Sequence, residues 1–260
     1  MSRVARLAAA GALMALALVG MARADTQQIG NMIVHVTAKL APKELPRDGL
    51  SPIAVSVGWK ISSTDGTETP TLKTVKIAIN RNGTLDPTGL PTCPYSQIQP
   101  ASTSRALKNC RPSLVGTGNF SAHVGLEGQE NYITHGRMVV FNSVKGGKPV
   151  LYGQIYTDFP FAASFVIPFV VDHQKHGSFG TTLTAKLPES LRDWGNLTEV
   201  NMRLSRNFSY RGGRRSFLTA ACPTPKGVAK AVFSLAKTSF AFDNGAKASS
   251  TLSETCKVRR

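Results

Sequence analysis

The sequence predicts an all-β protein, an antiparallel β-sandwich with very little helix. Apolar and polar residues alternate with a period of two over most of the chain, as they do in strands with one buried and one solvated face. Turn-forming clusters separate these segments, and the chain contains 23 glycines and 15 prolines to supply the turns. The 3.6-residue period of amphipathic helices is nearly absent.

Strands are expected wherever this alternation holds. In the first of them, Met32, Val34 and Val36 alternate with Ile33 and His35. The expected strands cover residues 31–40, 53–61, 75–79, 115–125, 136–142, 150–157, 162–171, 180–187, 197–204, 216–221, 229–242 and 250–258. Single helical turns are expected at 94–99 and 188–194, and hairpin connections at 146–149 and 211–214. About a dozen strands suit an immunoglobulin-like or a jelly-roll-like sandwich.

The first 24 residues are a predicted signal peptide. Two arginines precede an apolar run from Leu7 to Met21. Ala22 and Ala24 are the small residues that a signal peptidase reads, so cleavage is expected before Asp25. The protein is therefore expected to be secreted, outside the cytoplasm.

The mature chain, residues 25–260, is expected to form one sandwich domain, with a possible boundary near 127–131. No apolar run in it approaches the roughly 18 residues that a membrane-spanning helix needs. Its formal net charge falls from +16 for the full chain to +13, because Arg3, Arg6 and Arg23 leave with the signal. Such a charge favours anionic partners, and a polymer or surface of the cell envelope is the expected one.

Four cysteines in an exported chain predict two disulfides. Cys93, Cys110, Cys222 and Cys256 allow three pairings. The nearest-neighbour pairing, Cys93 with Cys110 and Cys222 with Cys256, closes the shorter loops and is the one expected. A metal site is disfavoured, since no C-x-x-C pair occurs and no histidine lies at finger-like spacing from a cysteine.

No catalytic residue is predicted. The G-x-S-x-G string of a nucleophile elbow is absent. Gly116 and Gly118 lie in a strand pattern, so they indicate a bulge or a close backbone approach rather than a phosphate loop. Asp172, His173 and His176 are weak metal-ligand candidates, and a polar turn after a buried strand is the preferred interpretation. No cofactor is expected.

The strongest functional candidate is a basic and aromatic stretch around two glycines. It comprises Arg203, Arg206, Tyr210, Arg211, Arg214 and Arg215. Guanidinium groups suit phosphate, sulfate and carboxylate, and aromatic rings stack on bases or sugars. Taken by itself, the stretch favours another interpretation, in which the aromatic rings belong to the core and the arginines form a solvated hairpin turn whose charges only prevent edge pairing.

Five strings resemble a group of uncharacterised exported all-β proteins of high-GC bacteria. They are Gly89–Pro94, Val115–Gly118, Phe179–Ala185, Arg211–Ser216 and Ala221–Gly227. The resemblance extends over most of the mature chain and over the surroundings of all four cysteines. It implies export, an all-β fold and a structural cysteine framework. That group carries no assigned activity, so the resemblance implies no site residue.

These observations favour a secreted, disulfide-stabilised, non-enzymatic protein that contacts an anionic polymer or surface of the cell envelope. One alternative is a secreted hydrolase or carbohydrate-active enzyme whose site forms only in three dimensions. Another is a lectin-like module that recognises sugars through Trp59, Trp194 or tyrosines. The preferred interpretation requires that the arginines between 206 and 215 are not scattered over different faces of the molecule.

Overall fold

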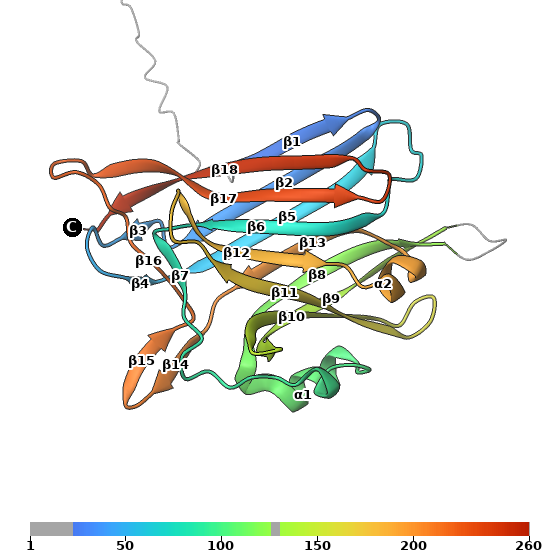
Figure 1. Cartoon of the computed structure of the whole chain (residues 1–260), viewed down its shortest axis with the longest axis horizontal. Helices are drawn as coiled ribbons and strands as arrows, with labels where there is room; N and C mark the ends of the chain where they lie inside the picture. The colour runs from blue at the N-terminus through green and yellow to red at the C-terminus, as the bar shows by residue number, and fades with distance from the viewer. Residues whose placement is uncertain (1–22, 126–130, 260) are drawn as a thin grey trace, which may run out of the picture.

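The computed structural model describes residues 23–125 and 131–259, and strands dominate it (Figure 1). Within these ranges thirteen strands form one curled sheet, antiparallel throughout except for the last pair. In sheet order they are β1 (Arg23–Ile29), β2 (Met32–Ala41), β5 (Ala54–Ser63), β13 (Asn196–Leu204), β8 (Leu114–Val124), β9 (Tyr132–Lys145), β10 (Lys148–Thr157), β11 (Ala163–His173), β12 (Phe179–Lys186), β6 (Leu72–Asn80), β17 (Lys230–Phe242), β18 (Lys247–Val258) and β3 (Glu44–Leu45).

Smaller elements lie around this sheet. A three-stranded sheet contains β4 (Ser51–Pro52), β16 (Leu218–Ala220) and β7 (Gly83–Leu85). The hairpin of β14 (Asn207–Tyr210) and β15 (Gly213–Ser216) projects from the body (Figure 1). The helices are α1 (Thr103–Cys110) and α2 (Glu189–Trp194), with 3-10 turns at Tyr95–Gln97 and Arg111–Ser113. Within the described ranges no helix has both the length and the apolar character needed to cross a membrane.

The predicted all-β class with little helix is confirmed. Every expected strand range overlaps an observed strand, and the turn expected at 188–194 contains α2. The two-sheet sandwich stays a prediction, because the strands of the main sheet form one hydrogen-bonded series that curls over itself.

One core fills the inside of the curled sheet. In β2 the predicted alternation builds it, since Val34 and Val36 are buried while His35 is partly exposed. Figure 1 shows the last strands, β17 and β18, lying over β1 and β2. Trp59 of β5 therefore meets Phe240 of β17 edge to face, with ring centroids 6.0 Å apart. Full burial of an aromatic or aliphatic side chain of this kind stabilises the fold by about 1.5–3 kcal/mol.

A side chain joins β1, at one end of the sheet, to β18, the last strand but one in the sheet order. The carboxamide of Gln27 in β1 donates to the carbonyl of Ser249 in β18. It also accepts from the amide of Ser249 at 2.9 Å. One side chain thus takes the place of a peptide unit between two strands that are not otherwise paired.

A second, smaller core lies on the outside of β9 and β10. The segment from Cys93 to Ser113, which includes α1, packs against their outer face. Ile98 of this segment is buried together with Phe141 of β9 and Tyr152 of β10. Six consecutive residues in each of these two strands are consequently buried, where alternation alone would leave every second one exposed.

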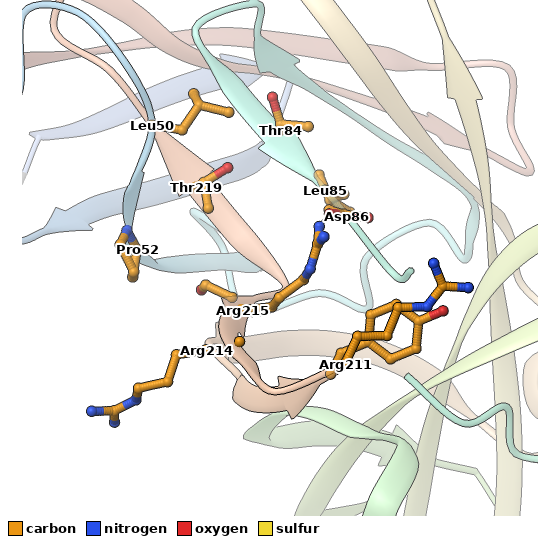
Figure 2. Close-up of a pocket in the computed structure, with 12 residues that line it drawn as sticks. Leu50, Pro52, Thr84, Leu85, Asp86, Arg211, Arg214, Arg215 and Thr219 are labelled. Carbon is orange, nitrogen blue, oxygen red and sulfur yellow. Dashed lines mark ion pairs between the residues drawn. The ribbon is translucent and has the colours of Figure 1, made fainter. Parts of the chain in front are cut away.

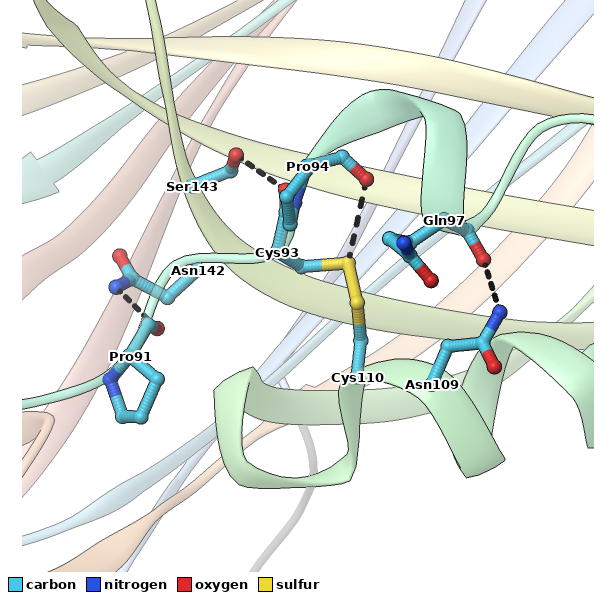
Figure 3. Close-up of a disulfide and its surroundings, with 8 residues drawn as sticks. All are labelled: Pro91, Cys93, Pro94, Gln97, Asn109, Cys110, Asn142 and Ser143. Carbon is cyan, nitrogen blue, oxygen red and sulfur yellow. Dashed lines mark hydrogen bonds between the residues drawn. A yellow bond between two sulfur atoms is a disulfide. The ribbon is translucent and has the colours of Figure 1, made fainter.

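Both disulfides have the predicted nearest-neighbour pairing. Cys93 and Cys110 close the α1 segment, with Cα atoms 5.5 Å apart (Figure 3). Ser143 Oγ donates to the carbonyl of Cys93 at 2.6 Å and holds the disulfide against β9 (Figure 3). The second disulfide joins Cys222, just after β16, to Cys256 of β18, with Cα atoms 5.9 Å apart.

The predicted signal peptide lies outside the described residues, except for Arg23 and Ala24. These two residues begin β1, opposite β2. Cleavage before Asp25 would shorten β1 to five of its seven residues. The possible boundary near 127–131 falls almost wholly on residues 126–130, which the structure does not describe.

Candidate functional site

The predicted hairpin connection forms the tip of β14 and β15. Arg211 and Gly212 are its central residues, with φ of 50° and 77°. Positive φ at both positions is the requirement of a type I′ turn, which matches the twist of the flanking strands. Arg211 is the only non-glycine residue of positive φ in the described ranges, and this backbone costs an L-residue about 1–2 kcal/mol. The turn holds the start of the Arg211 side chain in a fixed direction.

A groove of about 610 Å³ separates this hairpin from the three-stranded sheet (Figure 2). The sheet side and the loop before it supply mostly apolar or hydroxyl groups, and the hairpin side supplies an aromatic ring and cations. The lining side chains include Leu50, Pro52, Thr84, Leu85, Asp86, Tyr210, Arg211, Arg214, Arg215, Ser216 and Thr219.

Tyr210 organises the cations of the groove. The guanidinium carbon of Arg211 lies 5.2 Å from the centre of its ring, and that of Arg215 lies 5.8 Å away. The ring of Tyr210 also packs against Gly89, where a Cβ atom would come within 2.4 Å of the ring. The phenol therefore packs on bare backbone, and both guanidinium groups are within reach of its electron-rich face.

Of the three hairpin arginines, only Arg215 makes an ion pair within the described ranges. Its Nη1 lies 3.5 Å from Oδ2 of Asp86, toward which it points in Figure 2. Arg214, the residue before it in β15, points away from Asp86 (Figure 2), because adjacent residues occupy opposite faces of a strand. Across residues 23–125 and 131–259, Arg211 and Arg214 form no ion pair.

The structure brings together four of the six residues singled out in this stretch and separates the other two. Tyr210, Arg211, Arg214 and Arg215 line the groove. Arg206 lies before β14, and its Nε is buried without a hydrogen-bond partner in the described part of the chain. Arg203 belongs to β13, on the outer face of the main sheet, and lines a different hollow.

The weak metal candidates lie in a polar turn. Asp172 and His173 end β11, His176 follows, and all three are exposed. His173 Nδ1 lies 3.3 Å from the hydroxyl of Thr181 on the neighbouring strand. The described residues contain no group of three side chains suited to holding a metal ion.

A hydroxyl–histidine pair on open strands was not foreseen. Ser121 Oγ and His135 Nδ1 are 2.8 Å apart, and Glu199 lies opposite Ser121 on the next strand. The carboxylate of Glu199 accepts from Asn201 rather than holding the imidazole, as the acid of a catalytic triad would. Bonds of the same kind join other histidines on the sheet to threonines of the neighbouring strand. The pair is therefore interpreted as a cross-strand contact; the sequence shows both residues but not the strand order that joins them.

The tryptophans do not form an exposed sugar-binding platform. Trp59 is 3% exposed and belongs to the core, so its proposed role in a lectin-like module is wrong. Trp194 is partly buried and packs against Phe165, with ring centroids 5.1 Å apart. The aromatic ring that does line the groove is that of Tyr210.

The chain matches no family model, and no curated protein or solved structure matches it. The assignment of a role therefore depends on the geometry and charge of its own surfaces.

Proposed function

We propose that this is a secreted, disulfide-stabilised, non-enzymatic protein that binds an anionic polymer of the cell envelope through the hairpin groove. One observation carries the proposal: three arginines line the groove against a single carboxylate, that of Asp86. Asp86 pairs with Arg215, so in the described ranges Arg211 at the tip and Arg214, which points away from Asp86, are left without a carboxylate partner and can meet a ligand (Figure 2).

The chemistry of these groups suits an anionic ligand. A guanidinium presents a planar fork of donors that matches carboxylate, sulfate and phosphate. The turn fixes where the Arg211 side chain begins, and its planar guanidinium loses less freedom for each hydrogen bond formed than a lysine ammonium does. A mature charge of +13, expected after loss of the signal, adds long-range attraction to a polyanion.

The proposed location rests on the cysteines and on the predicted signal. Disulfides persist in oxidising compartments and are rare in the cytosol. Two of them, with all four cysteines paired, favour an extracytoplasmic protein.

Binding to isolated envelope over a salt series tests the proposal. The mature protein is compared with R211A/R214A and with K76A/K237A, whose lysines lie on exposed positions of β6 and β17. Both variants lose two positive charges, so the net charge is matched. Wild-type binding should weaken steeply with salt, and R211A/R214A should bind about tenfold more weakly or worse, while the control stays within about twofold. Equal weakening of both variants, or none in R211A/R214A, would exclude the groove as the binding site.

Removing the carboxylate of the groove gives a test of opposite sign. In D86N the guanidinium of Arg215 is released from its ion pair, so binding to the envelope should strengthen by several-fold at low salt. Weaker binding in D86N would show that Asp86 supports the site instead of competing for it.

A further inference from the structure

A second hollow, of about 400 Å³, lies on the outer face of the main sheet over β2, β5, β13 and β8. Lys39 and Arg203 line it and stand in one row across the strands. In that row Lys39 pairs with Ser56, Ser56 with Arg203, and Arg203 with Thr117. Because neighbouring strands lie about 4.8 Å apart, the two cationic residues are anchored about 10 Å from each other.

The floor of the hollow is backbone and short polar groups. The next row joins Thr37, Gly58, Asn201 and Asn119 across the same four strands. A Cβ atom at Gly58 would meet Asn201 Oδ1 at 2.1 Å and Thr37 Oγ1 at 2.9 Å. The Asn201 carboxamide and the Thr37 hydroxyl lie over the bare backbone of Gly58, so the floor is low and presents hydroxyl and carboxamide groups.

The hollow has a net positive charge. No carboxylate is among its lining residues. The acidic residue before it on β13, Glu199, accepts from Asn201 Nδ2 at 2.8 Å and faces Lys60 across the strand pair. Throughout the described ranges Lys39 and Arg203 make no ion pair. Two cations without counter-ions therefore flank a polar floor.

We infer that this hollow binds an acidic polysaccharide, a chain of sugars that carry carboxylates. The inference rests on the proposed binding of an anionic polymer and names the class of that polymer. Hydroxyl and carboxamide groups both donate and accept, so they suit the hydroxyls of sugar rings, while Lys39 and Arg203 suit the carboxylates. No aromatic side chain lines the hollow, although stacked bases of a single-stranded nucleic acid would need one.

The hollow and the hairpin groove are close along the chain. Arg203 lies near the end of β13, and the hairpin begins at Asn207. On the other side, Pro52 lines the groove and Ser56 of β5 lines the hollow. A polymer held in one site is therefore presented to the other at raised effective concentration.

Titration of the mature, oxidised protein with polygalacturonate tests the inference. Dextran is the neutral polysaccharide, and polyphosphate and single-stranded DNA are the other polyanions. The variants are K39A/R203A and T117E, which keeps both cations but adds a carboxylate beside Arg203; K76A/K237A is the control. Thermal unfolding of each variant, compared with wild type, checks the fold.

We expect binding of polygalacturonate but not of dextran, weakened about tenfold or more in K39A/R203A and in T117E and within about twofold of wild type in the control. Unchanged affinity in K39A/R203A and T117E would overturn the inference. Tighter binding of polyphosphate or DNA that depends on Lys39 and Arg203 would overturn the polysaccharide class. Envelope binding by R211A/R214A tests the hairpin groove separately. If R211A/R214A loses envelope binding while K39A/R203A binds polygalacturonate as tightly as wild type, this inference alone is overturned. If K39A/R203A loses polygalacturonate binding while R211A/R214A keeps its envelope binding, the groove alone is overturned.

Discussion

Removal of the Cys93–Cys110 disulfide should lower the free energy of unfolding by about 3 kcal/mol. The two cysteines are 17 residues apart, and in the chain-entropy model a cross-link of that span restricts the unfolded chain by this amount. The matched variant is C222A/C256A, whose cysteines are 34 residues apart. Because that loop is twice as long, its removal should cost about 0.6 kcal/mol more than C93A/C110A.

The C93A/C110A variant should still fold, because other contacts hold the α1 segment on the sheet. Gln154 Nε2 donates to the carbonyl of Ala101 at 2.8 Å, and Ile98 stays in the outer core. The segment should nevertheless open more often; Arg105 and Lys108 of α1 are already exposed, and opening makes the peptide bonds that follow them accessible to trypsin.

Two measurements check this prediction. Urea unfolding followed by tryptophan fluorescence gives the loss of stability, since Trp59 lies in the main core. Trypsin digestion under native conditions gives the rate of cutting in α1, which should rise in C93A/C110A and much less in C222A/C256A. A loss below about 1 kcal/mol in C93A/C110A, or a larger loss there than in C222A/C256A, would refute the loop-entropy argument.

Three further predictions concern single side chains. Phe141 is fully buried in the outer core, so F141A should lower the free energy of unfolding by about 3–5 kcal/mol in a denaturant titration; a loss under about 1 kcal/mol would contradict tight packing there. Hydrogen bonds from Thr67 and a neighbouring asparagine lower the pKa of Asp65 to about 2. The stability that these bonds provide is complete above about pH 4 and is lost as the pH falls through 2. D65N should therefore flatten this part of the acid-unfolding curve, and an NMR titration of Asp65 in the wild-type protein with a midpoint near 4 would contradict the prediction. Burial, and then the charge of Tyr95, raises the pKa of Tyr152 above its ordinary value, so an alkaline absorbance titration should show a phenol that ionises above the ordinary range in wild type and not in Y152F; an unchanged titration would be the contrary result.

Local patterns were enough to predict most of the strands and the hairpin tip. Alternation in β2 depends only on which residues avoid water, and the turn at Arg211 depends only on a glycine beside it. The glycine prediction is also confirmed: β8 has a register shift between Leu114 and Gly116, and Gly118 lies against the backbone of β13. The disulfide pairing could be predicted from loop length, because each cysteine is bonded to its nearest cysteine neighbour in the chain.

The remaining features depend on contacts between distant segments. Helix α1 carries a Ser102 cap but has only eight residues and no acidic residue in its first turn, so its stability comes from the outer face of β9 and β10. Asp86 and Arg215 meet across more than a hundred residues. Lys39 and Arg203 share a hollow only because β5 lies between β2 and β13, and no local pattern encodes that order.

The strand order also determines when this protein can fold. Trp59 of β5 pairs with Val200 of β13, and Ile77 of β6 pairs with both Leu183 of β12 and Thr238 of β17. The pairings of β5 with β13 and of β6 with β17 therefore cannot form until most of the chain is available, whereas β8 to β12 pair with their neighbours in sequence. These long-range pairings raise the contact order and slow folding. The predicted signal would export the chain unfolded, and slow closure of the core would then keep the chain in a transportable state until its last strands arrive.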